Sequence, residues 1–173
     1  DDGSVVANGN RFDRYSELAM EEGVGELLCL SHWGGRTDGR WECPTMDFGQ
    51  YWATRASDGA QVVLQPEQFA KAIYDHLIER GWLDRFATHI ADEPIPVNEA
   101  SYKVMSERIR AVAPKLRQMD AIHVPDLVGY TDIMVPQLNY FEEWLDGFMD
   151  AQAKGLAEDR KSTRLNSSHE SPS

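Results

Sequence analysis

Apolar residues recur every three or four positions along four stretches of the chain, which is the spacing of helices that bury one face. The second stretch starts at Pro66, a favoured first helical residue, and ends before Gly81. Pro114 ends the third stretch, and Asn139 is expected to cap the start of the fourth. The pattern predicts helices over residues 10–22, 66–80, 97–113 and 139–154.

Short apolar runs lie between these helices and have the length of buried strands. They cover residues 26–31, 86–91, 119–124 and 132–135, with a brief helical turn expected at Asp126. The long stretch that follows the first run is irregular, with a hairpin expected around Asp58 and Gly59. Strands that alternate with helices in this way predict an α/β fold with a parallel sheet.

Polar residues follow the carboxyl ends of several predicted strands, namely His32, Asp92 with Glu93, His123 or Asp126, and Gln137. A site shared by the ends of different strands is typical of a (β/α)8 TIM-type barrel. A complete barrel needs about 250 residues, so four strands predict a partial barrel that is truncated at both ends. The sequence lacks GxGxxG and GxxxxGK[ST] motifs, so no cofactor is expected.

The charge balance narrows the range of partners. The 173 residues contain 17 Lys and Arg against 29 Asp and Glu, which gives a net charge of −12 and a pI near 4.7. Such a chain repels phosphate backbones and anionic membranes, so nucleic-acid binding is not expected. The apolar runs are far shorter than the roughly 18 residues of a membrane span. No pattern in the sequence fixes an oligomeric state.

Two cysteines are present, and they indicate neither a disulfide framework nor a metal cluster. Cys29 lies in a predicted buried strand and is expected to be a small core residue. The position of Cys43 in the irregular stretch gives it no predicted role.

Residues 159–173 differ in composition from the rest of the chain, because they are rich in Ser, Asn, Arg and Lys. The peptide from Asp159 to His169 can be encoded in register by a common short-read sequencing adapter. We therefore predict that residues 1–158 form the partial barrel, as an internal fragment of a longer protein, and that the tail is translated adapter. The acidity belongs to the body, because the tail holds three basic and two acidic residues.

The segment HIADEPIP carries the strongest candidate chemistry. Side chains alternate along a strand, so Ile90 is expected to face the helices while His89 and Glu93 share the opposite face. Asp92 lies where the strand ends, and Pro94 favours an extended backbone at Glu93. Two neighbouring carboxyl groups in one pocket suit a general acid with a raised pKa beside a charged partner. The alternative interpretation is that the acidic pair caps the following helix.

Three sequence segments resemble one known family. The helix KAIYDHLIERGWLDRF runs directly into THIADEP, with NRFDRYSELAMEEGVGELLCLSHWG upstream and DIMVPQL downstream. Together they resemble the catalytic barrel of family 123 glycoside hydrolases and the uncharacterised domains related to it. The resemblance covers about residues 10–148.

The resemblance implies an exo-acting β-N-acetylgalactosaminidase that uses substrate-assisted catalysis, an exception to the usual two-carboxylate scheme. In that scheme the 2-acetamido oxygen of the sugar attacks the anomeric carbon, and the anomeric configuration is retained. By the resemblance, Glu93 is the general acid that protonates the leaving oxygen, and Asp92 orients the acetamido group. The family also implies a bacterial protein that is secreted or periplasmic. The chain by itself is expected to be inactive, since part of the barrel is expected to be missing.

Further residues are candidates for contacts with a carbohydrate. Aromatic rings stack on the apolar face of a pyranose, so Trp33 is either a sugar platform or part of the core. Packing is the favoured role for the other aromatic residues of the irregular stretch, Trp41, Tyr51 and Trp52. The polar residues expected to bind substrate are His32, His123 and Gln137.

Two other functions stay open at this point. A metal-dependent barrel hydrolase or isomerase would use His32, His89 and His123 with Asp92 or Glu93, because imidazoles and carboxylates bind divalent metals. These residues form no compact motif such as HExxH, which weakens that alternative. A carbohydrate-binding barrel without catalytic activity is the second alternative.

Overall fold

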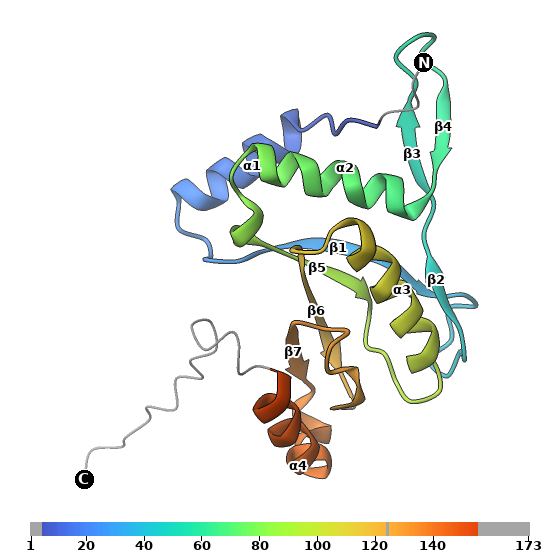
Figure 1. Ribbon diagram of the computed structural model, residues 1–173, viewed down its shortest axis with the longest axis vertical. Coiled ribbons are helices and arrows are strands. Elements are labelled where there is room, and N and C mark those ends of the chain that lie inside the picture. Colours follow the sequence, from blue (N-terminus) through green and yellow to red (C-terminus); the bar gives the residue numbers. More distant parts are fainter. Residues whose placement is uncertain (1–4, 124, 156–173) are drawn as a thin grey trace.

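The computed structural model describes residues 5–123 and 125–155, which form four α-helices and seven β-strands (Figure 1). The helices are α1 (Asn10–Glu21), α2 (Pro66–Glu79), α3 (Glu99–Val112) and α4 (Leu138–Gly155). The strands are β1 (Leu28–Arg36), β2 (Met46–Phe48), β3 (Tyr51–Thr54), β4 (Gln61–Leu64), β5 (Phe86–Ala91), β6 (Arg117–Ile122) and β7 (Ile133–Pro136). Two short 3-10 helices, η1 (Leu83–Arg85) and η2 (Pro125–Leu127), precede β5 and β7.

Five strands form one sheet in the order β2-β1-β5-β6-β7. The strands β1, β5, β6 and β7 run parallel, and β2 pairs antiparallel with β1. The strands β3 and β4 form a separate antiparallel hairpin. The α/β class and the parallel sheet are therefore confirmed. The sheet of the described residues is open, with β2 and β7 at its edges, so the partial barrel stays a prediction.

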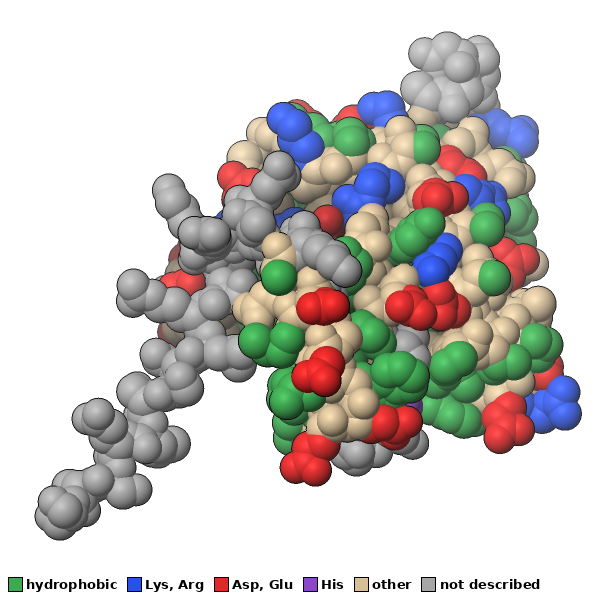
Figure 2. All heavy atoms as spheres, turned by 60° about the horizontal axis from the view of Figure 1, so that its bottom comes forward, with side chains coloured by type: hydrophobic (Ala, Val, Ile, Leu, Met, Phe, Trp, Pro, Cys, Tyr) green, Lys and Arg blue, Asp and Glu red, His purple; other side chains and the backbone are tan. Residues whose placement is uncertain are grey.

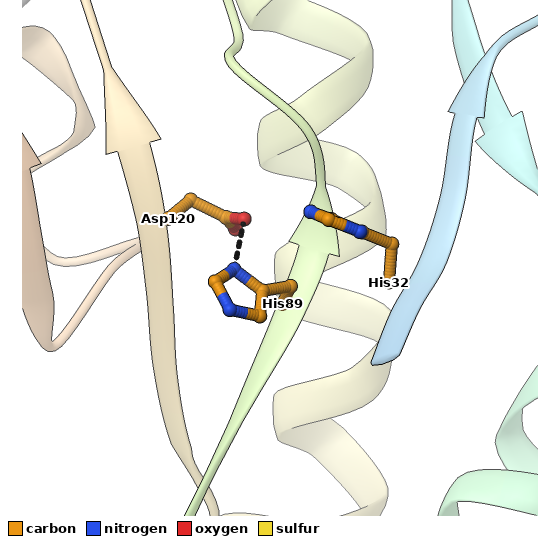
Figure 3. A group of neighbouring side chains, drawn as sticks. All are labelled: His32, His89 and Asp120. Atoms are coloured by element: carbon orange, nitrogen blue, oxygen red, sulfur yellow. Dashed lines mark hydrogen bonds and ion pairs between the residues drawn. The ribbon is translucent and has the colours of Figure 1, made fainter. Parts of the chain in front are cut away.

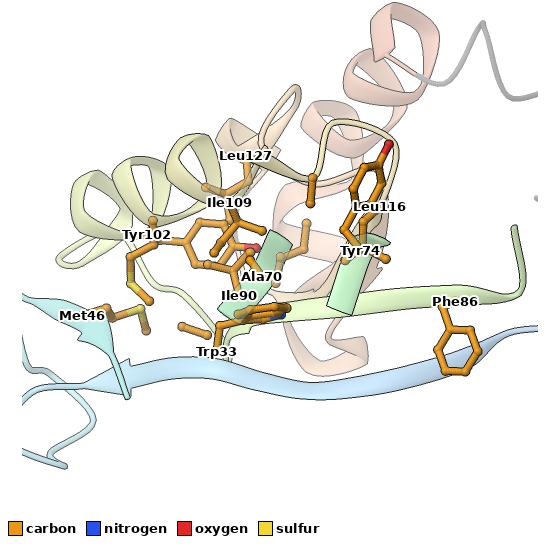
Figure 4. Close-up of a cluster of buried hydrophobic side chains, with 14 of the residues drawn as sticks. Trp33, Met46, Ala70, Tyr74, Phe86, Ile90, Tyr102, Ile109, Leu116 and Leu127 are labelled. Atoms are coloured by element: carbon orange, nitrogen blue, oxygen red, sulfur yellow. The ribbon is translucent and has the colours of Figure 1, made fainter. Parts of the chain in front are cut away.

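The core lies between the sheet and the helices α2 and α3 (Figure 4). Helix α2 begins at Pro66, after a capping box in which the side chains of Gln65 and Gln68 each bond a backbone group of the other residue. Alternate residues of β5 face these helices, and Ile90 is fully buried among them, as the strand pattern predicts. Large members of the cluster are Trp33, Tyr74, Leu77, Phe86, Ile90, Tyr102 and Ile109.

The structure corrects the predicted end of the first strand. Strand β1 extends to Arg36, so His32 and Trp33 lie inside the strand and not in a loop after it. Gly34 and the next glycine look like loop residues in the sequence, yet both pair with β2. A Cβ at Gly34 would collide with the backbone carbonyl of Asp47, so this close approach requires glycine.

Other local expectations are also tested by the structure. Cys29 is exposed, because it lies on the face of β1 that the helices do not cover, so its assignment to the core was wrong. Helix α4 begins one residue before Asn139, which therefore is not its cap. The hairpin around Asp58 and Gly59 is confirmed as the turn between β3 and β4. The tail over residues 159–173 lies outside the described residues.

Helix α4 exposes several apolar side chains. Leu138 is 89% exposed and Met149 is 55% exposed. Figure 2 shows the end of the molecule at which α4 lies, where hydrophobic side chains gather between separate acidic ones. Within the described part of the chain, no helix combines the length and the apolar character that crossing a bilayer requires.

Candidate active site

Polar side chains gather toward the carboxyl ends of the four parallel strands, where the strands of α/β barrels carry their active sites. Each of β1, β5, β6 and β7, or the segment directly after it, contributes at least one such residue. In chain order they are His32, Arg36, His89, Asp92, Glu93, Asp120, His123 and Gln137.

The structure brings the predicted acid pair together with two of the predicted substrate-binding residues. The side chain of Asp92 is 64% exposed, and its Oδ1 lies 3.5 Å from Nε2 of His32. Glu93 is half-buried, and the side-chain amide of Gln137 donates a hydrogen bond to its Oε1. The two carboxylates therefore follow one strand, but their partners come from β1 and from the end of β7.

The backbone of Glu93 differs from the sequence expectation. Its φ is 49°, and it is the only residue other than glycine with a positive φ among the described residues. The preference that Pro94 imposes for an extended predecessor is overridden here, because Arg36 donates hydrogen bonds to the carbonyl oxygens of Asp92 and Glu93 at 3.0 and 2.8 Å. A side chain in this sparsely allowed region is strained, and such strain concentrates at functional sites.

A buried carboxylate lies beside the acid pair. Asp120 is fully buried, and its Oδ1 lies 3.0 Å from Nδ1 of His89. Its Oδ2 accepts hydrogen bonds from the backbone N–H of Ile90, at 3.0 Å, and from the hydroxyl of Tyr102. The paired register of β5 and β6 ends at Thr88, so this carboxylate takes the place of a backbone acceptor for Ile90.

These contacts set the charge of the neighbouring groups. The hydrogen bond from His89 to Asp120 raises the pKa of the imidazole, against the opposing effect of burial, and the charges of Asp120 and Asp92 raise it further. Burial raises the pKa of the Tyr102 hydroxyl, so Tyr102 stays a neutral hydrogen-bond donor. Burial lowers the pKa of His123, and the nearby charge of Glu93 opposes that effect.

Three of these side chains are close enough together to hold a divalent metal. One candidate ligand atom from each of His32, His89 and Asp120 lies within 4.8 Å of the other two, and the rings of the two histidines are 4.7 Å apart (Figure 3). The third ligand beside His32 and His89 is thus Asp120, whereas the sequence predicted His123 in the metal-dependent alternative. Because Asp120 also accepts two further hydrogen bonds, it has the outer partners that orient metal ligands.

The aromatic candidates separate into packed and exposed groups. Trp33 is only 3% exposed and donates a hydrogen bond from its indole to Thr88, so it packs in the core and presents no face to a sugar. Trp41 is 46% exposed, and its ring lies 5.3 Å from that of His123. Tyr51 stacks on Phe69 at 4.5 Å. The exposed indole beside the acid pair is therefore that of Trp41, for which the sequence favoured packing.

Two residues of the site were missed by sequence reasoning. Asp120 had a detectable signal, because it is the single carboxylate within the predicted strand over residues 119–124. Arg36 had none, because all three of its hydrogen-bond acceptors are backbone carbonyls of Trp41, Asp92 and Glu93. A surface hollow lined by residues of β1, β2 and β3 adjoins Arg36 and His32.

The sequence was also compared with known proteins. The family model described as glycoside hydrolase 123, catalytic domain, matches residues 1–166. A search of curated proteins finds no match to the chain. The polar residues at the strand ends lie within the matched range, and the chain belongs to the glycoside hydrolase 123 family.

Proposed function

We propose that the protein hydrolyses the glycosidic bond of a β-linked N-acetylhexosamine that resembles N-acetylgalactosamine. The catalysis is substrate-assisted and retains the anomeric configuration. The observation that carries this proposal is the adjacent pair Asp92 and Glu93 directly after β5, with Gln137 bonded to Glu93. Membership of the glycoside hydrolase 123 family supports the reaction class.

Adjacency of the two carboxylates favours this mechanism over the ordinary schemes. Retaining and inverting enzymes place two carboxyl groups on opposite sides of the scissile bond, about 5–10 Å apart. Neighbouring residues at the end of one strand approach a sugar from the same side. The acetamido oxygen of the substrate then supplies the nucleophile, and neither carboxylate has to attack the anomeric carbon.

The contacts of the two carboxylates support different roles. The amide of Gln137 donates to Oε1 of Glu93, which leaves Oε2 to carry the proton of a general acid. Glu93 gives that proton to the leaving oxygen as the acetamido oxygen forms its bond to the anomeric carbon. Glu93 then takes a proton from the water that opens the cyclic intermediate. Asp92 orients the acetamido N–H.

His32, His123 and Trp41 complete the proposed substrate contacts. His32 lies beside Asp92, where it reaches the same part of the sugar. His123 lies against the exposed ring of Trp41, whose indole suits the apolar side of a pyranose on the face that the Arg36 guanidinium does not cover. Gln137 acts on the reaction through Glu93, so we assign it a positioning role.

The test is hydrolysis of aryl β-N-acetylgalactosaminides by the full-length protein. Glu93→Gln is expected to lower kcat by about 10²–10⁴-fold for an aglycone that needs protonation. Glu42→Gln, at an exposed glutamate in the loop before β2, is the matched control and should leave kcat unchanged. Full activity of Glu93→Gln, or equal turnover of the matching β-galactoside that lacks the acetamido group, would contradict the proposal.

A metal-dependent hydrolase is the second candidate function, and the cluster of His32, His89 and Asp120 is the observation that favours it. Stoichiometric zinc or manganese in the purified protein, with activity lost on chelation and in Asp120→Asn, would favour this candidate. Activity that is unchanged by a chelator would remove it.

A further inference from the structure

Arg36, at the end of β1, joins two segments that are far apart in the sequence. Its Nε donates to the carbonyl oxygen of Trp41 at 2.8 Å, while Nη1 and Nη2 donate to those of Asp92 and Glu93 at 3.0 and 2.8 Å. The guanidinium also lies 4.3 Å from the centroid of the Trp41 ring. A planar group with fixed donor directions suits such a contact, because it aligns several acceptors at once.

The two carbonyls held by the end of the guanidinium belong to the two peptide planes on either side of the Glu93 Cα. The orientation of these planes relative to each other is set by φ and ψ of Glu93, since each peptide unit is itself planar. A rigid donor that fixes both oxygen atoms therefore restricts both dihedral angles. The residue after Glu93 is Pro94, which has no N–H to make a competing contact.

The restriction is needed because Glu93 has a φ of 49°. A glutamate leaves this region for a more favourable one unless other contacts hold it. The direction of the Cα–Cβ bond follows from the backbone angles, so the angles determine where the carboxyl group lies. In the observed conformation it reaches the amide of Gln137.

We propose that Arg36 is the positioning residue of the general acid: by holding the carbonyls of Asp92 and Glu93 it fixes the left-handed backbone of Glu93 and aims the carboxyl group at the leaving oxygen. The inference rests on the proposed function of Glu93. Lysine is no substitute, because a single ammonium lacks the rigid fork of donors that reaches all three carbonyls.

The chain offers a matched control for this role. Arg85 also donates from Nε and Nη2 to two backbone carbonyls, those of Glu26 and Gly25, at 2.9 and 3.1 Å. These lie before β1, at the opposite end of the sheet from the acid pair. Arg85→Lys therefore removes a similar structural contact without touching the site.

The experiment compares Arg36→Lys, Arg85→Lys and Glu93→Gln in the full-length protein, on two aryl β-N-acetylgalactosaminides. One has a poor leaving group, which needs the general acid, and the other is the 2,4-dinitrophenyl glycoside, which does not. Arg36→Lys is expected to lower kcat about 10²-fold on the first substrate, the scale of a misplaced catalytic group, and less than about threefold on the second. KM should change little, and Arg85→Lys should alter neither rate.

A purely structural role gives a different result, since both rates would then fall together. Arg36→Gln with added guanidinium chloride provides a second measurement, in which the free ion restores the rate on the poor leaving group. Equal loss on both substrates, or no loss on either, overturns the assignment of Arg36.

The failure of this inference can be told from failure of the proposed function. If Glu93→Gln lowers kcat equally on the two substrates, then Glu93 is not the general acid and both proposals are refuted. If Glu93→Gln lowers kcat more on the poor leaving group and Arg36→Lys does not, only the role of Arg36 is refuted.

Discussion

The buried carboxylate of Asp120 offers a direct test of how the site is held together. The change is Asp120→Asn, which keeps the size of the side chain but removes its charge and replaces one oxygen by an amide. Asp120 accepts three hydrogen bonds, from His89, from the backbone N–H of Ile90 and from Tyr102. The single oxygen of asparagine can keep the two bonds that share Oδ2, but the amide N–H₂ then faces His89.

The size of the effect follows from the bond that is lost. A hydrogen bond to a charged group contributes about 1.5–3 kcal/mol to folding stability, so we expect Asp120→Asn to lower the free energy of unfolding by that amount. For a chain of this length, each kcal/mol moves Tm by about 2–4 °C. Asp126→Asn, at an exposed aspartate in η2, is the matched control and should leave Tm unchanged.

The pH dependence gives the sharper measurement. Asp120 raises the pKa of His89 in the folded protein. The resulting stability is fully present below the unfolded pKa, about 6.5, and is lost as the pH rises through the folded pKa. The free energy of unfolding should therefore fall across this window in the wild type. In Asp120→Asn this fall should disappear, because burial then lowers the pKa of His89.

The assay combines urea unfolding at several pH values with an NMR titration of the His89 ring. The titration reports the pKa of His89 directly, and unfolding reports its consequence for stability. If the pKa of His89 is the same in Asp120→Asn as in the wild type, then the pairing of these two side chains does not control the charge of the imidazole.

Two further predictions concern the sheet. Gly34→Ala is expected to cost about 1–3 kcal/mol of stability, since the new Cβ meets the backbone carbonyl of Asp47. A urea midpoint equal to that of the wild type would show that β1 and β2 do not approach so closely. Val135→Lys, at a side chain that is 46% exposed on the edge strand β7, is expected to reduce self-association of residues 1–158 in sedimentation experiments. Equal association of the two proteins would rule out this edge as the contact.

Elements whose cause is local could be predicted from the sequence. Strand β5 has the predicted bounds, because a continuous apolar run of strand length lies between η1 and the acid pair. Helix α2 begins at Pro66 as predicted, since its start depends on neighbouring residues. The hairpin at Gly59 likewise follows from the turn chemistry of two adjacent residues.

Features that depend on distant partners could not be predicted. The glycines at the end of β1 form a strand because β2 pairs with them, and β2 is a three-residue strand with no clear pattern. The backbone of Glu93 opposes the local preference set by Pro94, because Arg36 holds it from another strand. The sequence thus indicates which residues are chemically useful, while the conformation that aims them depends on contacts between strands.

The contact of Arg36 with Trp41 has a consequence for protein engineering. The loop between β1 and β2 supplies one acceptor to the same guanidinium that holds the acid pair, so an insertion there would disturb the site. The turn between β3 and β4 projects from the far end of the molecule (Figure 1). Backbone hydrogen bonds join Arg55 to Gly59 and Ala60 and close this turn. An inserted peptide tag or fused domain belongs in that turn, where extra length is absorbed without reaching the acid pair.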